Sequence, residues 1–181
     1  MKRSLGILVL ALAAGVALQA ATVNLTASGP LSGSFDVFVN VTNVFDPPHD
    51  GDSFLAYGFD LSFDNTVLSY LGETPGPLFD DLSSNPGIDA QVAGTASSIL
   101  LNDGDFTEPL NLAVLHFSRI GIGGTGISIT GDAAGSLDQG LIYLSGSDSF
   151  AARTELQALP EPATFGLIGA ALLAFGIVRR R

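Results

Sequence analysis

The chain has 181 residues, with 18 acidic and 7 basic side chains and no cysteine. The lack of cysteine excludes disulfide bonds, thiolate metal sites and cysteine nucleophiles. A net charge of −11 gives a surface that repels phosphate backbones, so nucleic acid is excluded as a partner.

The first residues have the layout of a secretory signal peptide. Lys2 and Arg3 precede an apolar stretch at 5–18, and two alanines follow shortly after it. A basic start, a short apolar core and small residues at the cut site are typical of such a signal. We therefore predict that residues 1–21 form a signal helix that directs export and is removed near the two alanines.

The central segment, 22–159, is long enough for one domain with a hydrophobic core. Its clearest element is predicted at 54–63, where every second side chain from Leu55 to Phe63 is aromatic or leucine and Asp60 faces the other way. Similar alternation predicts strands near 23–27, 35–41, 110–119, 127–130 and 141–144. Seven to nine strands separated by Pro, Gly and Asp turns favour an all-β sandwich of two antiparallel sheets.

Two loops of this predicted sandwich are rich in the oxygen ligands that calcium prefers. A structural calcium ion in either loop is one hypothesis, and solvated turn acids are the commoner alternative. Neither loop has EF-hand spacing, because the twelfth position counted from Asp46 is Tyr57 and not glutamate. The candidate ligands are Asp46, Asp50 and Asp52 in the first loop, and Asn102, Asp103, Asp105 and Glu108 in the second.

No group of residues indicates catalysis, so we predict no catalytic residue and no enzyme. His49 and His116 are far apart in the sequence, and a zinc site needs three or four converging ligands; His116 is expected on an outer sheet face. The glycines at 121–126 fit a nucleotide-binding pattern, but the next residues, 127–130, alternate as a strand where that pattern needs a helix. We expect a flexible hairpin loop there instead.

Exposed aromatic side chains would distinguish a sugar-binding sandwich from other binding classes. Phe38 is out of phase with the apolar residues around it, so it either faces outward or packs under the loop that begins at Asp46. The candidates for a flat sugar platform are Phe38, Tyr70, Phe106 and Tyr143.

The C-terminal segment 160–181 has three parts. A short polar motif is followed by the apolar run 163–178, which as a helix reaches about 24 Å, slightly less than the ~30 Å hydrocarbon core of a bilayer. A basic stop closes the chain. A terminal core helix of a soluble domain is the less favoured alternative. The motif residues are Pro160, Glu161 and Pro162, and the basic stop is Arg179, Arg180 and Arg181.

This segment resembles the PEP-CTERM sorting signal of Gram-negative bacteria, with residues 160–162 as its name-giving motif. The resemblance implies recognition of 160–162 by an exosortase-type processing enzyme, a transient transmembrane helix at 163–178 and a cytoplasmic stop at 179–181. It also implies an association with exopolysaccharide. A permanent, uncleaved anchor is the alternative left open.

The middle of the chain resembles a cohesin-like β-sandwich, a jelly roll related in fold to some carbohydrate-binding modules. The resemblance covers about 22–132 and rests on the phrase Gly-Phe-Asp-Leu-Ser-Phe-Asp-Asn-Thr-Val-Leu at 58–68, followed by Leu-Ala-Val-Leu-His-Phe at 112–117. Cohesins hold dockerin partners on one sheet face. No dockerin-contact residue can be matched here, so that partner is not implied.

Together these features predict an exported, non-catalytic adhesion or scaffold protein of the cell surface or extracellular matrix, held by the membrane at least transiently. The alternatives are a carbohydrate-binding module and a structural matrix protein with no specific ligand. The expected partners are the exosortase-type enzyme, the membrane through the C-terminal helix, and a polysaccharide or a surface protein. No cofactor is expected beyond the hypothetical calcium ion.

Overall fold

A computed structural model shows an all-β domain. It describes residues 21–28, 33–83, 90–134 and 139–157. Every regular element within these ranges is a strand, and none of them contains a helix long and apolar enough to cross a membrane. The predicted signal helix before Ala21 and the predicted membrane helix at 163–178 lie outside the described residues.

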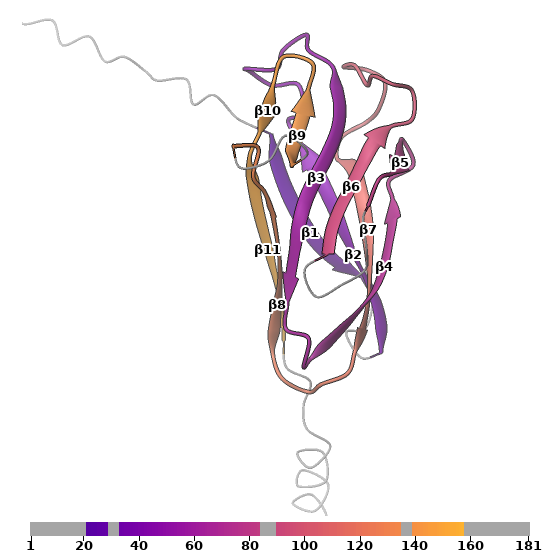
Figure 1. Ribbon diagram of the computed structural model, residues 1–181, viewed down its shortest axis with the longest axis vertical. Helices are drawn as coiled ribbons and strands as arrows, with labels where there is room; N and C mark the ends of the chain where they lie inside the picture. Colours follow the sequence, from indigo (N-terminus) through magenta and orange to yellow (C-terminus); the bar gives the residue numbers. More distant parts are fainter. Residues whose placement is uncertain (1–20, 29–32, 84–89, 135–138, 158–181) are drawn as a thin grey trace, which may run out of the picture.

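The strands form two antiparallel sheets that face each other (Figure 1). The first sheet has the order β1–β2–β7–β4. Its inner face carries Val37, Val39 and Val41 from β2, all fully buried as the alternation predicts. Phe35 of β2 stacks on Phe117 of β7, with ring centroids 5.9 Å apart. The strands are β1 (Thr22–Ser28), β2 (Ser34–Thr42), β4 (Leu68–Pro75) and β7 (Leu110–Arg119).

The second sheet is built around β3, which has β6 and then β5 along one edge. Its other edge is shared by two strands, because β9 pairs with Phe54–Gly58 and β8 pairs with Asp60–Phe63. β10 extends the sheet beyond β9, and β11 extends it beyond β8. The strands are β3 (Phe54–Phe63), β5 (Phe79–Asp81), β6 (Ala90–Ala96), β8 (Thr125–Gly131), β9 (Gly140–Tyr143), β10 (Ser147–Asp148) and β11 (Phe150–Leu156).

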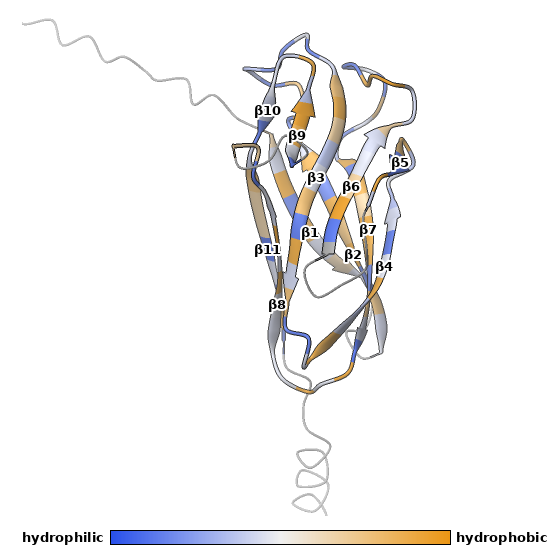
Figure 2. Ribbon diagram, in the orientation of Figure 1, coloured by the Kyte–Doolittle hydropathy of each residue, from blue (hydrophilic) through white to orange (hydrophobic). Residues whose placement is uncertain are grey.

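The core lies between the two sheets and is rich in aromatic rings. Phe54 makes edge contacts with Phe79 and Tyr143, at centroid distances of 5.9 and 5.2 Å. Figure 2 shows the alternation of apolar and polar residues along the strands that supplies this core. Each fully buried large apolar side chain contributes about 1.5–3 kcal/mol, and with no cysteine in the chain this burial replaces covalent cross-links.

The register of β3 differs from its predicted one at the start of the strand. Phe54 is fully buried, whereas Leu55 is only half-buried. The reason is an irregularity between Phe54 and Ala56 in the pairing with β9, which shifts the inward-facing set by one residue. From Tyr57 to Leu61 the predicted inward face is confirmed.

The sandwich has two ends of different character (Figure 1). At the upper end in Figure 1 lie the β2–β3 connection, 43–53, and the β6–β7 connection, 97–109; we call this the acidic end. At the lower end lie the β3–β4 connection, 64–67, and the β7–β8 connection, 120–124. We call it the tail end, because β11 finishes there and Gln157 leads into the C-terminal segment.

Candidate functional site

The two acidic loops singled out in the sequence meet at the acidic end, although about fifty residues separate them in the chain. They contain six carboxylates and no lysine or arginine. The fold brings them together because β2 and β7 are paired neighbours, so the chain leaves β2 where it enters β7. The six acids are Asp46, Asp50, Asp52, Asp103, Asp105 and Glu108.

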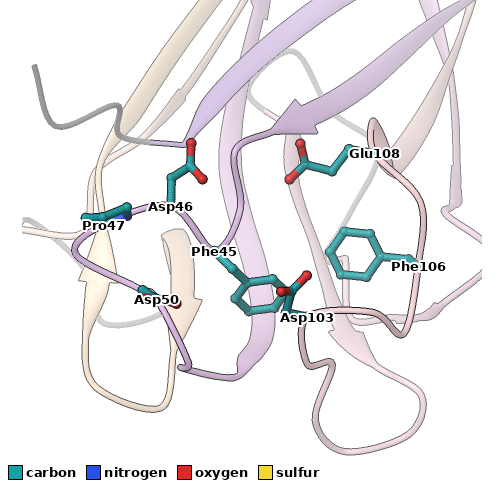
Figure 3. A pocket seen from close by; sticks show the side chains of 7 residues that line it. All are labelled: Phe45, Asp46, Pro47, Asp50, Asp103, Phe106 and Glu108. Atoms are coloured by element: carbon teal, nitrogen blue, oxygen red, sulfur yellow. The ribbon is translucent and has the colours of Figure 1, made fainter.

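A pocket of about 460 Å³ opens between these loops (Figure 3). The rings of Phe45 and Phe106 meet in it with centroids 5.8 Å apart and planes tilted by 38°. Each loop contributes one of the rings and two of the acids that line the pocket. The lining residues are Phe45, Asp46, Pro47, Asp50, Asp103, Phe106 and Glu108.

Some of the acids shape the loops themselves. The Glu108 carboxylate accepts hydrogen bonds from the backbone N–H groups of Asn43 and Val44, both at 2.9 Å, and so fastens the second loop to the end of β2. The Asp105 carboxylate accepts a 2.6 Å hydrogen bond from the N–H of Asn102. These oxygens are therefore occupied by protein donors, and Asn102, Asp105 and Asp52 do not line the pocket.

The remaining acids that line the pocket are Asp46, Asp50 and Asp103. Among the described residues, none donates a hydrogen bond to the side chains of Asp46, Asp50 or Asp103. Nor does the described part of the chain bring three or more histidine or acidic side chains close enough together to hold a metal ion. Calcium binding by these loops therefore stays one untested hypothesis, beside the commoner alternative of solvated turn acids. The arrangement suits a cation with an apolar stem, because the stem can lie on the rings while its charge meets the carboxylates.

His49 belongs to the first acidic loop but does not line the pocket, and it is only 5% exposed. Its Nδ1 is 3.2 Å from Oδ2 of Asp52, its Nε2 is 3.0 Å from Oδ2 of Asp148, and its ring stacks on Tyr143 at a centroid distance of 3.6 Å. Hydrogen bonds from the Ser145 hydroxyl, the Ser53 N–H and His49 lower the pKa of Asp52. A single sequence gives no signal for this cluster, because Asp148 is ninety-nine residues away from His49.

The other residues named from the sequence have structural surroundings. His116 lies on the outer face of β7 as expected, with its ring nitrogens 2.8 Å from Asp36 and 2.9 Å from Thr74. The glycine-rich connection at 120–124 leads into a strand and not a helix, which agrees with the prediction against nucleotide binding. It is not a hairpin, because β7 and β8 belong to different sheets.

The four aromatic candidates for a sugar platform are not exposed. Tyr143 is buried, and Phe38, Tyr70 and Phe106 are half-buried. Tyr70 packs on Phe117 at a centroid distance of 5.4 Å. The sorting residues at 160–162 and 179–181 lie outside the described part of the chain.

A second, smaller hollow of about 340 Å³ lies on the second sheet, over β9, β3 and β6. Leu82 at its rim is 60% exposed. Its lining is mostly apolar or small: Ala56, Tyr57, Leu82, Gln91, Ala93, Gly94 and Ile142.

Comparison with known families identifies the C-terminal segment. Residues 158–181 match the PEP-CTERM protein-sorting motif, beginning two residues before the predicted boundary at 160. The chain therefore carries a PEP-CTERM motif, which indicates export and sorting through a C-terminal anchor. A search of curated proteins found no match.

Comparison with solved structures identifies the fold. A cohesin module from the family 33 glycoside hydrolase of Clostridium perfringens superposes with a TM-score of 0.52 at 10% identity, covering 78% of this chain and all of the module. A type II cohesin from the Acetivibrio cellulolyticus cellulosome gives 0.46 at 13% identity, covering 73% and 88%. A non-cellulosomal cohesin from Archaeoglobus fulgidus gives 0.43 at 16% identity, covering 74% and 89%. The first likeness shows a cohesin-like fold.

Proposed function

We propose that this protein is an exported, non-catalytic scaffold or adhesion protein of the cell surface or extracellular matrix. The sorting motif at 158–181 supports delivery through the membrane, and the cohesin-like sandwich supports a binding role. An exosortase-type enzyme recognises Pro160, Glu161 and Pro162, while 163–178 spans the membrane. Exopolysaccharide is the surrounding material that such sorting implies.

The observation that carries the binding role is the pocket at the acidic end. It combines two phenylalanine rings with three carboxylates, those of Asp46, Asp50 and Asp103, to which no described residue donates a hydrogen bond. It lies at the end of the sandwich opposite the end of β11. A protein held or delivered by its C-terminal segment presents this end outward. We propose that the pocket takes an arginine or lysine side chain of a surface protein. A guanidinium over a phenylalanine ring gains about 0.5–1 kcal/mol at an exposed site.

Delivery is tested by mass spectrometry of the protein isolated from its native cells. If both the signal peptide and the C-terminal segment are cleaved, we expect a mature chain that begins near Thr22 and ends near Pro162. A chain that keeps Arg181 and stays in the membrane fraction would indicate a lasting anchor. Full-length protein in the cytosol, with neither end removed, would overturn the proposal.

The pocket is tested by titrating an arginine octapeptide into full-length protein held in lipid nanodiscs. We expect the double variant Asp46→Asn/Asp50→Asn to lose most of the affinity. The matched control, Asp80→Asn/Asp81→Asn, removes the same charge from β5, outside the pocket, and is expected to keep it. Equal losses in the two variants would mean general charge attraction and would remove the pocket from the proposal.

A second candidate site is the apolar hollow over β9, β3 and β6, where Leu82 is exposed. Its composition suits a protein partner with an apolar face. The variant Ala93→Arg would block this hollow and leave the acidic pocket intact. If a surface protein still binds the Asp46→Asn/Asp50→Asn variant but does not bind the Ala93→Arg variant, it binds at the hollow.

A further inference from the structure

The tail end exposes two large apolar side chains on one short connection. Ile120 is 62% exposed and Ile122 is 54% exposed, whereas Ile127 and Ile129 of the following strand are buried. These two exposed isoleucines on one connection are an apolar surface without a partner among the described residues. The place of this connection in the fold indicates which kind of partner covers the two isoleucines.

The connection at 120–124 is fastened to its neighbours. The N–H groups of Ile120 and Gly121 both donate to the carbonyl oxygen of Val67, at 2.8 and 3.0 Å. Gly121 has no room for a side chain, because an added Cβ would lie 2.7 Å from the carbonyl oxygen of Thr66. The loop that carries the two isoleucines is thus attached by its backbone to the β3–β4 connection, and both side chains are exposed.

The same loop is tied to the point where the chain leaves the sandwich. Arg119, 8% exposed, donates from Nε to the carbonyl oxygen of Gly121 at 3.1 Å and from Nη2 to that of Gly123. Nη2 also donates to the carbonyl oxygen of Gln157 at 3.0 Å. One buried guanidinium therefore holds the isoleucine loop beside the start of the C-terminal segment.

Little chain separates this point from the predicted membrane helix. Residues 158–162 lie between Gln157 and the apolar run 163–178, and at ~3.3–3.6 Å per residue they span at most roughly 20 Å. The headgroup zone on each side of the hydrocarbon core is itself about 5–8 Å deep. When 163–178 spans the bilayer, the tail end must lie close to the membrane surface.

The distribution of charge also favours an orientation in which the tail end is nearer to the membrane than the acidic end. Six acids lie in the two loops of the acidic end, whereas Asp64 is the one acid in the connections 64–67 and 120–124. A negatively charged leaflet repels the acidic end more strongly than the tail end. This asymmetry favours the tail end as the end of the sandwich that meets a lipid surface.

We propose that Ile120 and Ile122 insert into the interface of the bilayer that holds the C-terminal segment, so that the sandwich stands on the membrane with its acidic end outward. The proposal rests on the membrane-held form in the proposed function. The ligand is the boundary between headgroups and acyl chains, where apolar side chains leave water. Arg119 is the positioning residue, because it fixes the loop relative to Gln157.

The chain contains no tryptophan, so a single substitution supplies a unique fluorophore. Full-length Ile122→Trp is reconstituted into vesicles of phosphatidylcholine and phosphatidylglycerol, with and without acyl chains brominated near the headgroup. The matched control is Leu144→Trp, because Leu144 is 67% exposed after β9, at the acidic end. We expect blue-shifted emission and strong quenching by brominated lipid for Ile122→Trp alone, and quenching by aqueous iodide for the control.

The outcomes separate the two proposals. If the protein floats with the vesicles but Ile122→Trp is quenched by iodide as strongly as Leu144→Trp, the membrane contact is wrong and the anchor stands. If the full-length protein does not float with vesicles, the membrane-held form itself fails. Should Ile122→Trp not fold, Ile120→Cys carrying an environment-sensitive dye gives the same readout, because the chain has no other cysteine.

Discussion

His49 is the residue whose surroundings depend most on the tertiary fold. One ring nitrogen lies next to Asp52 of the same loop, and the other lies next to Asp148, ninety-nine residues along the chain. Tyr143 covers one face of the ring. His49 joins the first acidic loop to Asp148 of β10. Burial raises the pKa of the Tyr143 phenol above its ordinary value, which keeps this stacking partner uncharged.

We expect His49→Ala to lower the free energy of unfolding by about 1–3 kcal/mol, because it leaves buried polar partners without their hydrogen bonds. Urea denaturation of the purified protein measures this change. His116→Ala is the matched control, since that ring lies on an outer face with its side chain 35% exposed, and we expect it to cost less than about 1 kcal/mol. Equal losses would contradict the structural role of His49.

Asp52 gives the stability a defined dependence on pH. Its folded-state pKa is lowered from 3.8, first by the Ser145 hydroxyl, so its contribution is present in full at neutral pH and is lost as the pH falls below that value. We expect Asp52→Asn to be less stable than the wild type at pH 7 and to approach it near pH 2–3. Thermal melts across this pH range test the prediction. The control is Asp50→Asn, which removes one charge from the same loop. A stability gap that does not narrow in acid would count against it.

At the level of elements, the tight contact between the β7–β8 and β3–β4 connections gives a matched pair of substitutions. A Cβ at Gly121 would lie 2.7 Å from a backbone oxygen, whereas a Cβ at Gly123 would meet only Cγ2 of Val67 at 3.5 Å. We expect Gly121→Ala to cost about 1–3 kcal/mol through overpacking. Gly123→Ala should be neutral or slightly stabilising, because it restricts the unfolded chain. Chemical denaturation distinguishes the two, and similar values would show that the connections are not in contact.

The strands that the sequence predicts are those with strong alternation and a buried inner face. β2, β3 and β7 carry mainly valine, leucine and aromatic residues at every second position, so the alternation of a strand can be recognised from one sequence alone. β5, β6 and β10 are short or built from small and polar residues, and the described residues form eleven strands, more than the predicted seven to nine. β6 pairs with β3, β5 with β6 and β10 with β9, and these pairings are set by tertiary contacts that local alternation does not encode.

The candidate site was only partly predictable for the same reason. Both acidic loops can be recognised in the sequence by their many acidic residues. The sequence analysis names all four acids of the pocket as candidate ligands: Asp46, Asp50, Asp103 and Glu108. Their convergence depends on the pairing of β2 with β7. The aromatic pair of Phe45 and Phe106 depends on it as well, because a contact between residues so far apart leaves no trace in local pattern.

For the whole molecule, the concentration of acids at one end leads to a prediction about metal dependence. The carboxylates of Asp52, Asp105 and Glu108 already accept protein hydrogen bonds. We therefore expect the thermal midpoint to be the same in millimolar calcium and in excess chelator. Differential scanning calorimetry on one protein preparation makes the comparison. A midpoint that rises with calcium would support the alternative of a structural ion, and Asp46→Asn should then abolish the rise.

The placement of the pocket and Gln157 at opposite ends of the strands has a mechanical consequence. A pull between a partner bound in the pocket and the C-terminal tether runs along the strand axes. The ladder hydrogen bonds lie across that direction, so they bear the load together and are not peeled apart one after another. A domain held this way is expected to resist tension better than one pulled from the side of a sheet.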